Sequence, residues 1–183
     1  MTASDSIRLP KTIEADPRAA LLIAILAAPT HRLWTGGTLK VPVAQPTDGL
    51  RDALRAAQRA GRVVRSLEKA ETRLAAEDRG LQMADRKSGA SRGGRISRLL
   101  MLSADGSERF YRRVASLLKR HEPRLAAVYL TTDARQLGGL LFGGGASVRL
   151  VMIEHRESVG AVLLALAGQW ALTQTGGPGG PSS

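Results

Sequence analysis

The chain has 183 residues, of which 43% are hydrophobic and 3% aromatic, and it carries a formal net charge of +11 with an isoelectric point near 11.3. This length suffices for one substantial core, and the absence of cysteine excludes disulfides, thiolate zinc sites and thiol nucleophiles. The three histidines, His31, His121 and His155, stand in no known metal-binding spacing, so we expect neither a metal nor another cofactor.

Residues 1–46 are interpreted as an N-terminal extension. Its apolar run, residues 19–28, follows Asp16 as a candidate cap and Pro17 as the first helical residue, which predicts a short buried helix. A membrane span needs about 20 apolar residues, so we expect no membrane partner. A secretory signal is the weaker alternative, and a chain without cysteine suits the reducing cytoplasm that we expect. Residues 32–43 indicate a turn between two short extended pieces.

Residues 48–79 have helical character, and Gly61 is expected to interrupt the helix before Val63 and Val64. A second helix should then begin near Ser66. On the first helix arginine recurs at spacings of four, four and three, at Arg51, Arg55, Arg59 and Arg62. Such a row of guanidinium groups matches a phosphate backbone, but the solvated face of an ordinary amphipathic helix has the same pattern.

Positive charge is concentrated between residues 50 and 98, where thirteen Lys or Arg accompany six Asp or Glu. This surplus of seven is most of the net charge, and such a surface attracts polyanions through counterion release. A genome rich in arginine codons is the alternative explanation of the charge. Residues 80–95 are expected to form a flexible basic loop that can fold around phosphates or serve as a plain linker.

From residue 95 to residue 170 three apolar strands alternate with three helices. Helical connections between strands place helices on the faces of a sheet, which predicts a three-layer α/β/α sandwich around a small mixed sheet. We assign residues 47–172 to this domain. Residues 173–183 are rich in glycine, proline and serine and are expected to be a disordered tail.

Polar residues at the strand ends are candidates for chemistry, but each has a simpler explanation. Ser103, Asp105 and Ser107 follow the first strand, where α/β sheets often bind ligands and where a capped helix also begins. Glu154 and His155 end the third strand and have the residue types of an acid–base pair, with Glu157 placed to orient the imidazole. A polar end to a strand needs no catalysis, so we expect no enzyme.

Several segments, in this order, resemble the superfamily of large-subunit ribosomal proteins that bind kink-turn RNA. They are ALRAAQRAGRVV at residues 53–64, LLMLSADGSE at residues 99–108, and DARQLGGLLFGGG at residues 133–145, followed by a strand and a closing helix at residues 148–166. The resemblance covers residues 48–167, with an apparent insertion around residues 80–94.

The resemblance implies a sandwich that binds structured RNA through the start of the second helix and a loop near the last strand. Carried over by position, the first surface falls on Arg65, Ser66, Glu68, Lys69 and Thr72, and the second on residues 143–147. This chain departs from the family where Gly-x-Asn-Glu is replaced by Ser66-Leu67-Glu68-Lys69. Arginine contacts to phosphates would then have to supply more of the binding.

We therefore expect an RNA-binding protein that contacts structured RNA mainly through phosphates. An α/β protein–protein interaction module, and a small α/β nucleotide-binding or hydrolytic domain, are the alternatives. The expected RNA-binding residues are Arg59, Arg62, Arg65, Ser66, Glu68, Lys69, Arg92, Arg95, Arg98, Gly144 and Gly145.

Overall fold

The computed structural model describes residues 7–89 and 94–175. In chain order its elements are α1 (Ala19–Ala27), β1 (His31–Arg32), β2 (Lys40–Val41), β3 (Val43–Ala44), α2 (Asp48–Arg59), β4 (Val63–Arg65), α3 (Leu67–Ser88), β5 (Arg98–Leu102), α4 (Glu108–Arg120), β6 (Leu125–Leu130), α5 (Ala134–Phe142), β7 (Leu150–Ile153) and α6 (Arg156–Thr175). Within the described residues no helix combines the length and apolarity that crossing a membrane requires.

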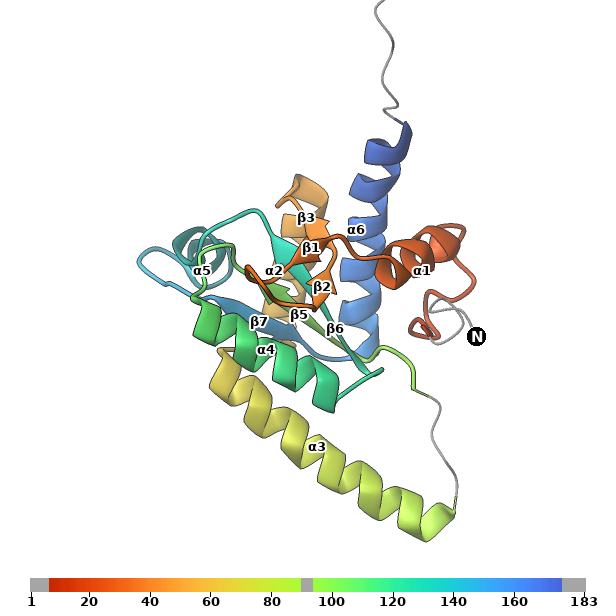
Figure 1. Ribbon diagram of the computed structural model, residues 1–183. Helices are drawn as coiled ribbons and strands as arrows, with labels where there is room; N and C mark the ends of the chain where they lie inside the picture. The colour runs from red at the N-terminus through yellow and green to blue at the C-terminus, as the bar shows by residue number, and fades with distance from the viewer. Residues whose placement is uncertain (1–6, 90–93, 176–183) are drawn as a thin grey trace, which may run out of the picture.

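A mixed five-stranded sheet lies at the centre of the described part of the chain (Figure 1). Its strand order is β3-β6-β5-β7-β4, with β3, β6 and β5 parallel and β7 antiparallel to both β5 and β4. The carboxyl ends of strands β3, β4, β5 and β6 therefore lie together along one end of the sheet, where β7 begins. We call this end of the strands the carboxyl edge and the opposite end the amino edge, and neither name refers to the outermost strands.

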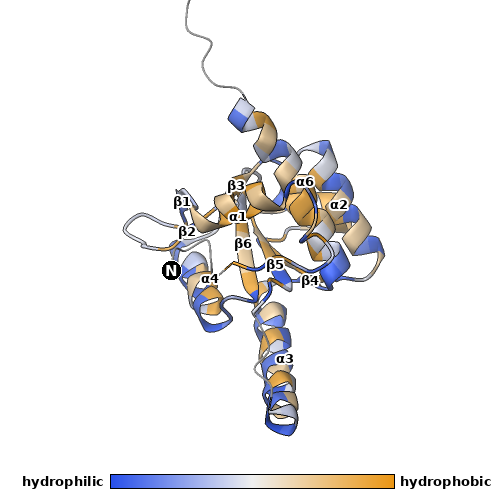
Figure 2. Cartoon of the chain, turned by 90° about the vertical axis from the view of Figure 1, so that its right-hand side faces the viewer, coloured by the Kyte–Doolittle hydropathy of each residue, from blue (hydrophilic) through white to orange (hydrophobic). Residues whose placement is uncertain are grey.

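Both faces of the sheet are buried, as the continuous apolar runs of its strands predict. Leu99 and Met101 of β5 face the core shared with α1, α2, α5 and α6, whereas Leu100 and Leu102 face the core shared with α3 and α4. The same alternation continues along β6 and β7. The predicted α/β/α sandwich with its mixed sheet is confirmed, and Figure 2 shows apolar residues gathered between the helical layers.

The N-terminal residues are part of this domain, so the expected boundary at residue 46 does not separate two structures. Strand β3 pairs with β6 at the edge of the sheet, and Leu9, Ile13 and Leu22 belong to the core beneath α6. Helix α1 begins at Ala19, later than Pro17, because the Asp16 carboxylate accepts hydrogen bonds from Arg18 and leaves the helix without a side-chain cap.

Helix α3 is longer than expected and includes much of the segment assigned to a basic loop. It passes through Gly80 and ends at Ser88, where Gly89 takes the left-handed conformation with φ of 64°. A glycine inside a helix costs only about 1 kcal/mol, and good helix formers follow it here. Of residues 80–95, therefore, those up to Ser88 are helical, while residues 90–93 lie outside the described residues. Figure 2 shows α3 projecting beyond the rest of the domain.

Helix α6 covers the open side of the edge strand β3 with polar side chains. Trp170 is buried and donates from its indole N–H to the Val43 carbonyl at 2.9 Å. Gln169 accepts from the Gln45 N–H at 2.9 Å and donates back to the Gln45 carbonyl at 3.0 Å. These bonds occupy backbone groups that an edge strand would otherwise expose.

Replacing the indole N–H should destabilise the fold measurably. We expect Trp170→Phe to lower the free energy of unfolding by about 1–2 kcal/mol, from the lost hydrogen bond and the smaller ring. Leu172→Ala, on the same helix at a position 75% exposed, is the control and should change it by less than about 0.5 kcal/mol. Urea denaturation measures both, and equal effects would contradict the role given to Trp170.

Candidate nucleic-acid interface

Several of the arginines expected to bind RNA lie at the amino edge, where the chain's own carboxylates hold them. Arg62 pairs with Glu157 at 3.2 Å, and Arg95 pairs with Glu14 at 3.2 Å while donating to the Leu9 carbonyl. Arg98 pairs with Glu77 at 2.8 Å, and both of these side chains are only 20% exposed. A guanidinium already bound to a carboxylate has fewer donors left for a phosphate.

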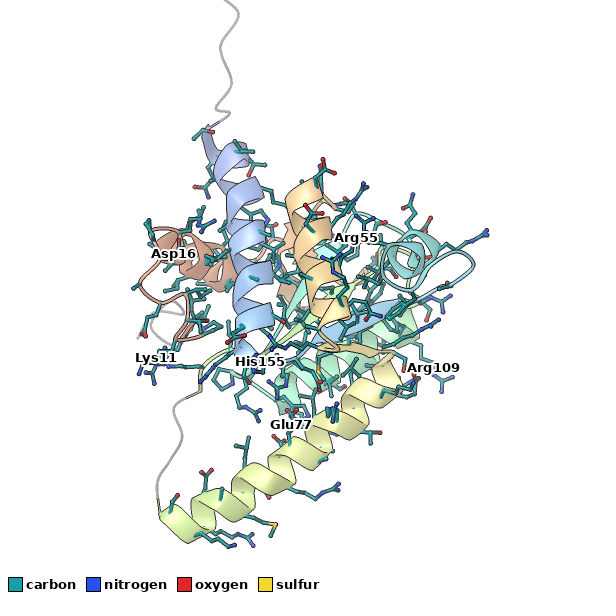
Figure 3. The ribbon with its side chains drawn as sticks, turned by 180° about the vertical axis from the view of Figure 1, so that it is seen from behind. Lys11, Asp16, Arg55, Glu77, Arg109 and His155 are labelled. Carbon is teal, nitrogen blue, oxygen red and sulfur yellow. The ribbon has the colours of Figure 1, made fainter. Side chains whose placement is uncertain are left out.

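Two of the carboxylates that pair with positively charged groups at the amino edge come from the middle of α3. Glu77 lies between Arg98 and Arg124, and Asp78 pairs with Arg124 at 3.2 Å. The Asp78 carboxylate also lies 3.0 Å from Nδ1 of His121, which is 2% exposed. Figure 3 shows Glu77 on α3 and His155 at the start of α6. These contacts fix α3 against the start of β5 and the end of α4, which gives the amino-edge arginines a structural role.

The carboxyl edge has a different charge balance. Arg65 ends β4, Lys69 lies in the first turn of α3, and Arg149 precedes β7; all three are exposed. None of the three has a carboxylate partner among the residues that the structure describes. The charges of Arg65 and Lys69 are therefore available to an anion from solvent, whereas the charge of Arg149 also acts on the carboxylate of Asp105 and helps to lower its pKa.

A surface hollow of about 210 Å³ brings the two family-derived surfaces together. Its lining includes Arg65, Ser66 and Glu68 from the β4–α3 junction and Ser147 and Arg149 from the α5–β7 connection. The Arg65 guanidinium also lies 4.8 Å from the centroid of the Phe142 ring, at the end of α5. We call this feature the Arg65 hollow. An open groove lined by Lys69, Thr72 and Arg73 continues from it along α3.

Ser66 has a backbone conformation that suits glycine. Its φ is 87° and its ψ is 153°, a region that L-residues rarely occupy because of their Cβ. The Ser66 N–H donates to the Leu150 carbonyl at 3.2 Å, and its hydroxyl caps α3 through a long contact of 3.4 Å from the Lys69 N–H. Ser66 is the position at which the resemblance described above implies a glycine.

The loop after α5 packs directly on that helix. A Cβ on Gly138 would collide with the backbone of Ala146 and Ser147, so only glycine permits this close approach. The Val148 N–H donates to the Ala134 carbonyl at 2.9 Å, which holds the end of the loop against the start of α5. Gly144 and Gly145 are exposed within this loop, with φ of 83° at Gly145.

Glu68 is held by the neighbouring helix. Arg113 of α4 bridges Glu68 at 3.1 Å and Glu71 at 2.8 Å, which joins α4 to the first turns of α3. The pKa of Glu68 is lowered chiefly by a hydrogen bond from its own backbone N–H and further by Arg113. Glu68 therefore remains ionised and repels phosphate less than an unpaired carboxylate would. Figure 3 shows Arg109, another exposed arginine of α4, beside the N-terminal end of α3.

No protein-family model matches this sequence, and no curated protein matches it significantly.

The remaining expected residues fall elsewhere. Arg59 is exposed near the end of α2 and has no ion-pair partner among the described residues. Arg92 lies outside the described residues. The structure thus divides the expected set: Arg65, Ser66, Glu68, Lys69, Gly144 and Gly145 lie at the carboxyl edge, and Arg62, Arg95 and Arg98 at the amino edge.

The strand-end carboxylates have structural partners. Asp105 accepts from the Ala134 N–H at 3.0 Å, which docks the start of α5 on the end of β5. Burial raises the pKa of Asp105, but the neighbouring Ser103 side chain, the Ala134 N–H and the positive charge of Arg149 together outweigh it, so this pKa lies below its ordinary value. Ser107 caps α4 by accepting from the Phe110 N–H at 3.1 Å.

The other candidate pair, Glu154 and His155, is similarly engaged. The Glu154 carboxylate pairs with Arg73 at 2.7 Å, and the Glu157 carboxylate pairs with Arg62. The Glu157 backbone N–H, rather than its carboxylate, contacts His155 Nδ1 at 3.4 Å. Among the described residues no group of three or more His, Asp or Glu side chains is arranged to hold a metal ion.

Sequence reasoning missed Arg149 and the arginines of α4. Arg149 precedes a fully apolar strand, and this isolated cation was the available signal. On α4, Arg109, Arg113 and Arg120 recur at helical spacing, but the apolar face of the same segment suggested only an ordinary covering helix. A charge count by helix face would have found the arginines of α4.

The strain at Ser66 can be measured. Ser66→Gly should raise the free energy of unfolding by about 1 kcal/mol, since relief of about 1–3 kcal/mol of backbone strain exceeds the weaker cap and the greater freedom of the unfolded glycine. Gly61→Ala, at a position with φ of 69°, is the opposite control and should destabilise. Destabilisation by Ser66→Gly would contradict the conformation assigned to this junction.

The ionised form of Asp105 should contribute to stability in a defined pH range. Because its folded pKa lies below the ordinary value of 3.8, its contribution is complete above that pH and is lost as the pH falls through the folded pKa. Asp105→Asn should therefore destabilise at neutral pH, and the difference from the parent protein should shrink below about pH 4. Urea titrations across this range test it, and a difference independent of pH would contradict an ionic role.

Proposed function

We propose that this chain binds structured RNA, chiefly through phosphate contacts at the carboxyl edge, and that it does so in the cytoplasm without catalysing a reaction. The observation that carries the proposal is the Arg65 hollow, where Arg65 and Arg149, which form no ion pair among the described residues, lie at two converging chain segments. Glu68 also lines this hollow but is paired with Arg113, and Lys69 lies in the adjoining groove along α3. Guanidinium and ammonium groups held by the ends of rigid strands and helices suit a phosphate backbone.

Two backbone features support the resemblance to the kink-turn-binding proteins. Ser66 retains a glycine-like conformation at the family's glycine position, and Gly138 lets the α5–β7 loop approach its helix as the Leu-Gly pair of the family would. The order of helices and strands from α2 to α6 also agrees with the sandwich that the resemblance implies. The proposed relationship to the kink-turn-binding family therefore rests on the course of the backbone, because the polar residues at the start of α3 differ from those of the family.

The differing residues favour phosphates over base edges. Glu68 accepts hydrogen bonds but cannot donate them as asparagine does, and its Oε1 is engaged by Arg113. Lys69 places a cation where the family has an acidic residue. Contacts from such groups set affinity and register and give little sequence selectivity.

The arginines of the amino edge are assigned to the fold in this proposal. Arg98 is mostly buried against Glu77, and Arg62 and Arg95 each have a carboxylate within 3.2 Å. We therefore narrow the interface to Arg65, Ser66, Lys69, Arg149 and the glycine loop at residues 143–145.

The proposal predicts a graded loss of affinity. Arg65→Gln, Lys69→Gln and Arg149→Gln should each weaken binding to a structured RNA severalfold, and each should lower the slope of log affinity against log salt by roughly 0.7–0.9, the value of one lost phosphate contact. Filter binding of one hairpin RNA at several salt concentrations measures both quantities.

The matched control is Arg156→Gln, which removes the same charge at the start of α6 on the amino edge. It should leave the salt slope nearly unchanged. Equal effects at Arg156 and Arg65 would indicate a general attraction of the net charge, and no salt-sensitive binding of the unmodified chain would remove the proposal altogether.

The loop contribution can be tested separately from charge. Gly138→Ala forces the backbone of Ala146 and Ser147 away from α5, which should displace the α5–β7 loop and weaken RNA binding without altering net charge. Gly139→Ala has open space at its Cβ and is the control, with binding expected to stay within about twofold. If Gly138→Ala binds RNA as tightly as the parent chain does, the α5–β7 loop is not part of the interface.

A further inference from the structure

A second hollow, of about 450 Å³, lies on the other face of the sheet, between α2 and α5. Its polar lining consists of Arg51 and Arg55 from α2 and Thr131, Thr132 and Gln136 from the end of β6 and the start of α5. Figure 3 shows Arg55 on the side of α2 toward α5. We call this feature the Arg55 hollow. It opens beyond the ends of the parallel strands β3 and β6, where α/β sheets commonly bind small ligands.

The hydrogen bonds around the side-chain amide of Gln136 occupy its oxygen and leave its NH₂ group without a partner in the described part of the chain. Its Oε1 accepts from the Thr132 hydroxyl at 2.8 Å and from the Asp133 N–H at 3.2 Å. Both partners are donors, which fixes the orientation of the amide and makes its NH₂ the group available to a ligand. This NH₂ has no partner among the described residues.

The arginines of the Arg55 hollow are likewise uncommitted. Arg51 and Arg55 are exposed, and neither pairs with a carboxylate in residues 7–89 or 94–175. No Asp or Glu belongs to the described lining of the hollow. Two guanidinium groups, an amide NH₂ and the Thr131 hydroxyl therefore face a shared space without an acid to neutralise them.

The chemistry of this lining matches one class of ligand. Two guanidinium forks and an amide donor complement a dianionic phosphate monoester, whose terminal oxygens accept several hydrogen bonds at once. Pro46 and Leu140 are the partly exposed apolar side chains of the lining and can contact an apolar or aromatic body, whereas Leu54, Leu130 and Leu137 are fully buried. The volume lies within the range of small-molecule sites.

We propose that the Arg55 hollow binds a phosphate monoester attached to a flat or apolar body, the class to which nucleoside 5′-monophosphates belong. The same group occurs on a free nucleotide and on the 5′ end of an RNA strand. This site lies on the α2 and α5 side, whereas the Arg65 hollow is lined by α3 and by the start of β7. The proposal therefore does not depend on RNA binding at the Arg65 hollow.

Isothermal titration of the full chain with adenosine 5′-monophosphate, adenosine and inorganic phosphate tests the proposal. The monophosphate should bind saturably and more tightly than either fragment. Arg55→Gln should weaken it by about tenfold or more, as the loss of a hydrogen-bonded charge implies. Arg59→Gln, an exposed and unpaired arginine on the same helix outside the Arg55 hollow, should change the affinity by less than twofold.

A second variant lowers the positive charge of the Arg55 hollow and keeps the capping contacts at the start of α5. Gln136→Glu keeps oxygens for the Thr132 and Asp133 donors and places a carboxylate beside the two arginines, which should abolish monophosphate binding while thermal unfolding stays close to that of the parent chain. Binding that survives Gln136→Glu, or that falls equally in Arg59→Gln, would overturn the proposal.

Short RNA oligonucleotides with a 5′-phosphate or a 5′-hydroxyl distinguish the two sources. An Arg55-dependent preference for the phosphorylated oligonucleotide over adenosine 5′-monophosphate supports the proposal with an RNA end as the ligand. Arg55-dependent binding of adenosine 5′-monophosphate alone supports it with a free nucleotide. If neither the nucleotide nor the phosphorylated end binds in an Arg55-dependent manner, the proposal is wrong.

Discussion

The ion pairs between the middle of α3 and the amino edge determine which basic residues remain for a partner. Glu77 and Asp78 hold Arg98 and Arg124 in mostly buried positions, and removing one member of such a pair leaves the other charge without compensation. Part of the net charge of +11 is therefore neutralised within the fold, and only part of it remains available at the surface. At the amino edge arginine supports the fold, whereas at the carboxyl edge Arg65, Lys69 and Arg149 form no ion pair among the described residues.

This division follows from the sheet. Because β4 and β5 run in the same direction on either side of β7, Arg62 and Arg98 are brought to one edge, while Ser66 and the residues after β5 reach the other. The helices that follow β4, β5 and β6 all begin at the carboxyl edge, with their N-terminal backbone donors and dipoles directed there. A short sequence distance, from Arg62 to Arg65, thus separates two different electrostatic environments.

The sequence predicted the fold better than the interface. Apolar runs at residues 95–170 revealed the central strands because burial on both faces leaves a local pattern, and the turn at Gly61 was anticipated. The continuation of α3 past Gly80 follows from the good helix formers after it, a local signal that the glycine obscured, whereas the membership of β3 in the sheet depends on tertiary contacts that no local pattern records. The pairing of Arg98 with Glu77 joins residues 21 positions apart in the chain, so it also depends on tertiary structure and leaves no local pattern. Spacing indicated a row of arginines, but only packing shows that Arg62 is held by Glu157 while Arg55 is free.

The central claim is that RNA phosphates meet the carboxyl edge and avoid the amino edge. Ultraviolet crosslinking of the full chain to a structured RNA, followed by mass spectrometry of the crosslinked peptides, tests it most directly. The account predicts crosslinks in peptides that contain residues 65–69 and 143–149. Crosslinks confined to peptides around Arg95, Arg98 or Arg156, or an absence of crosslinks under conditions of low salt, would contradict it.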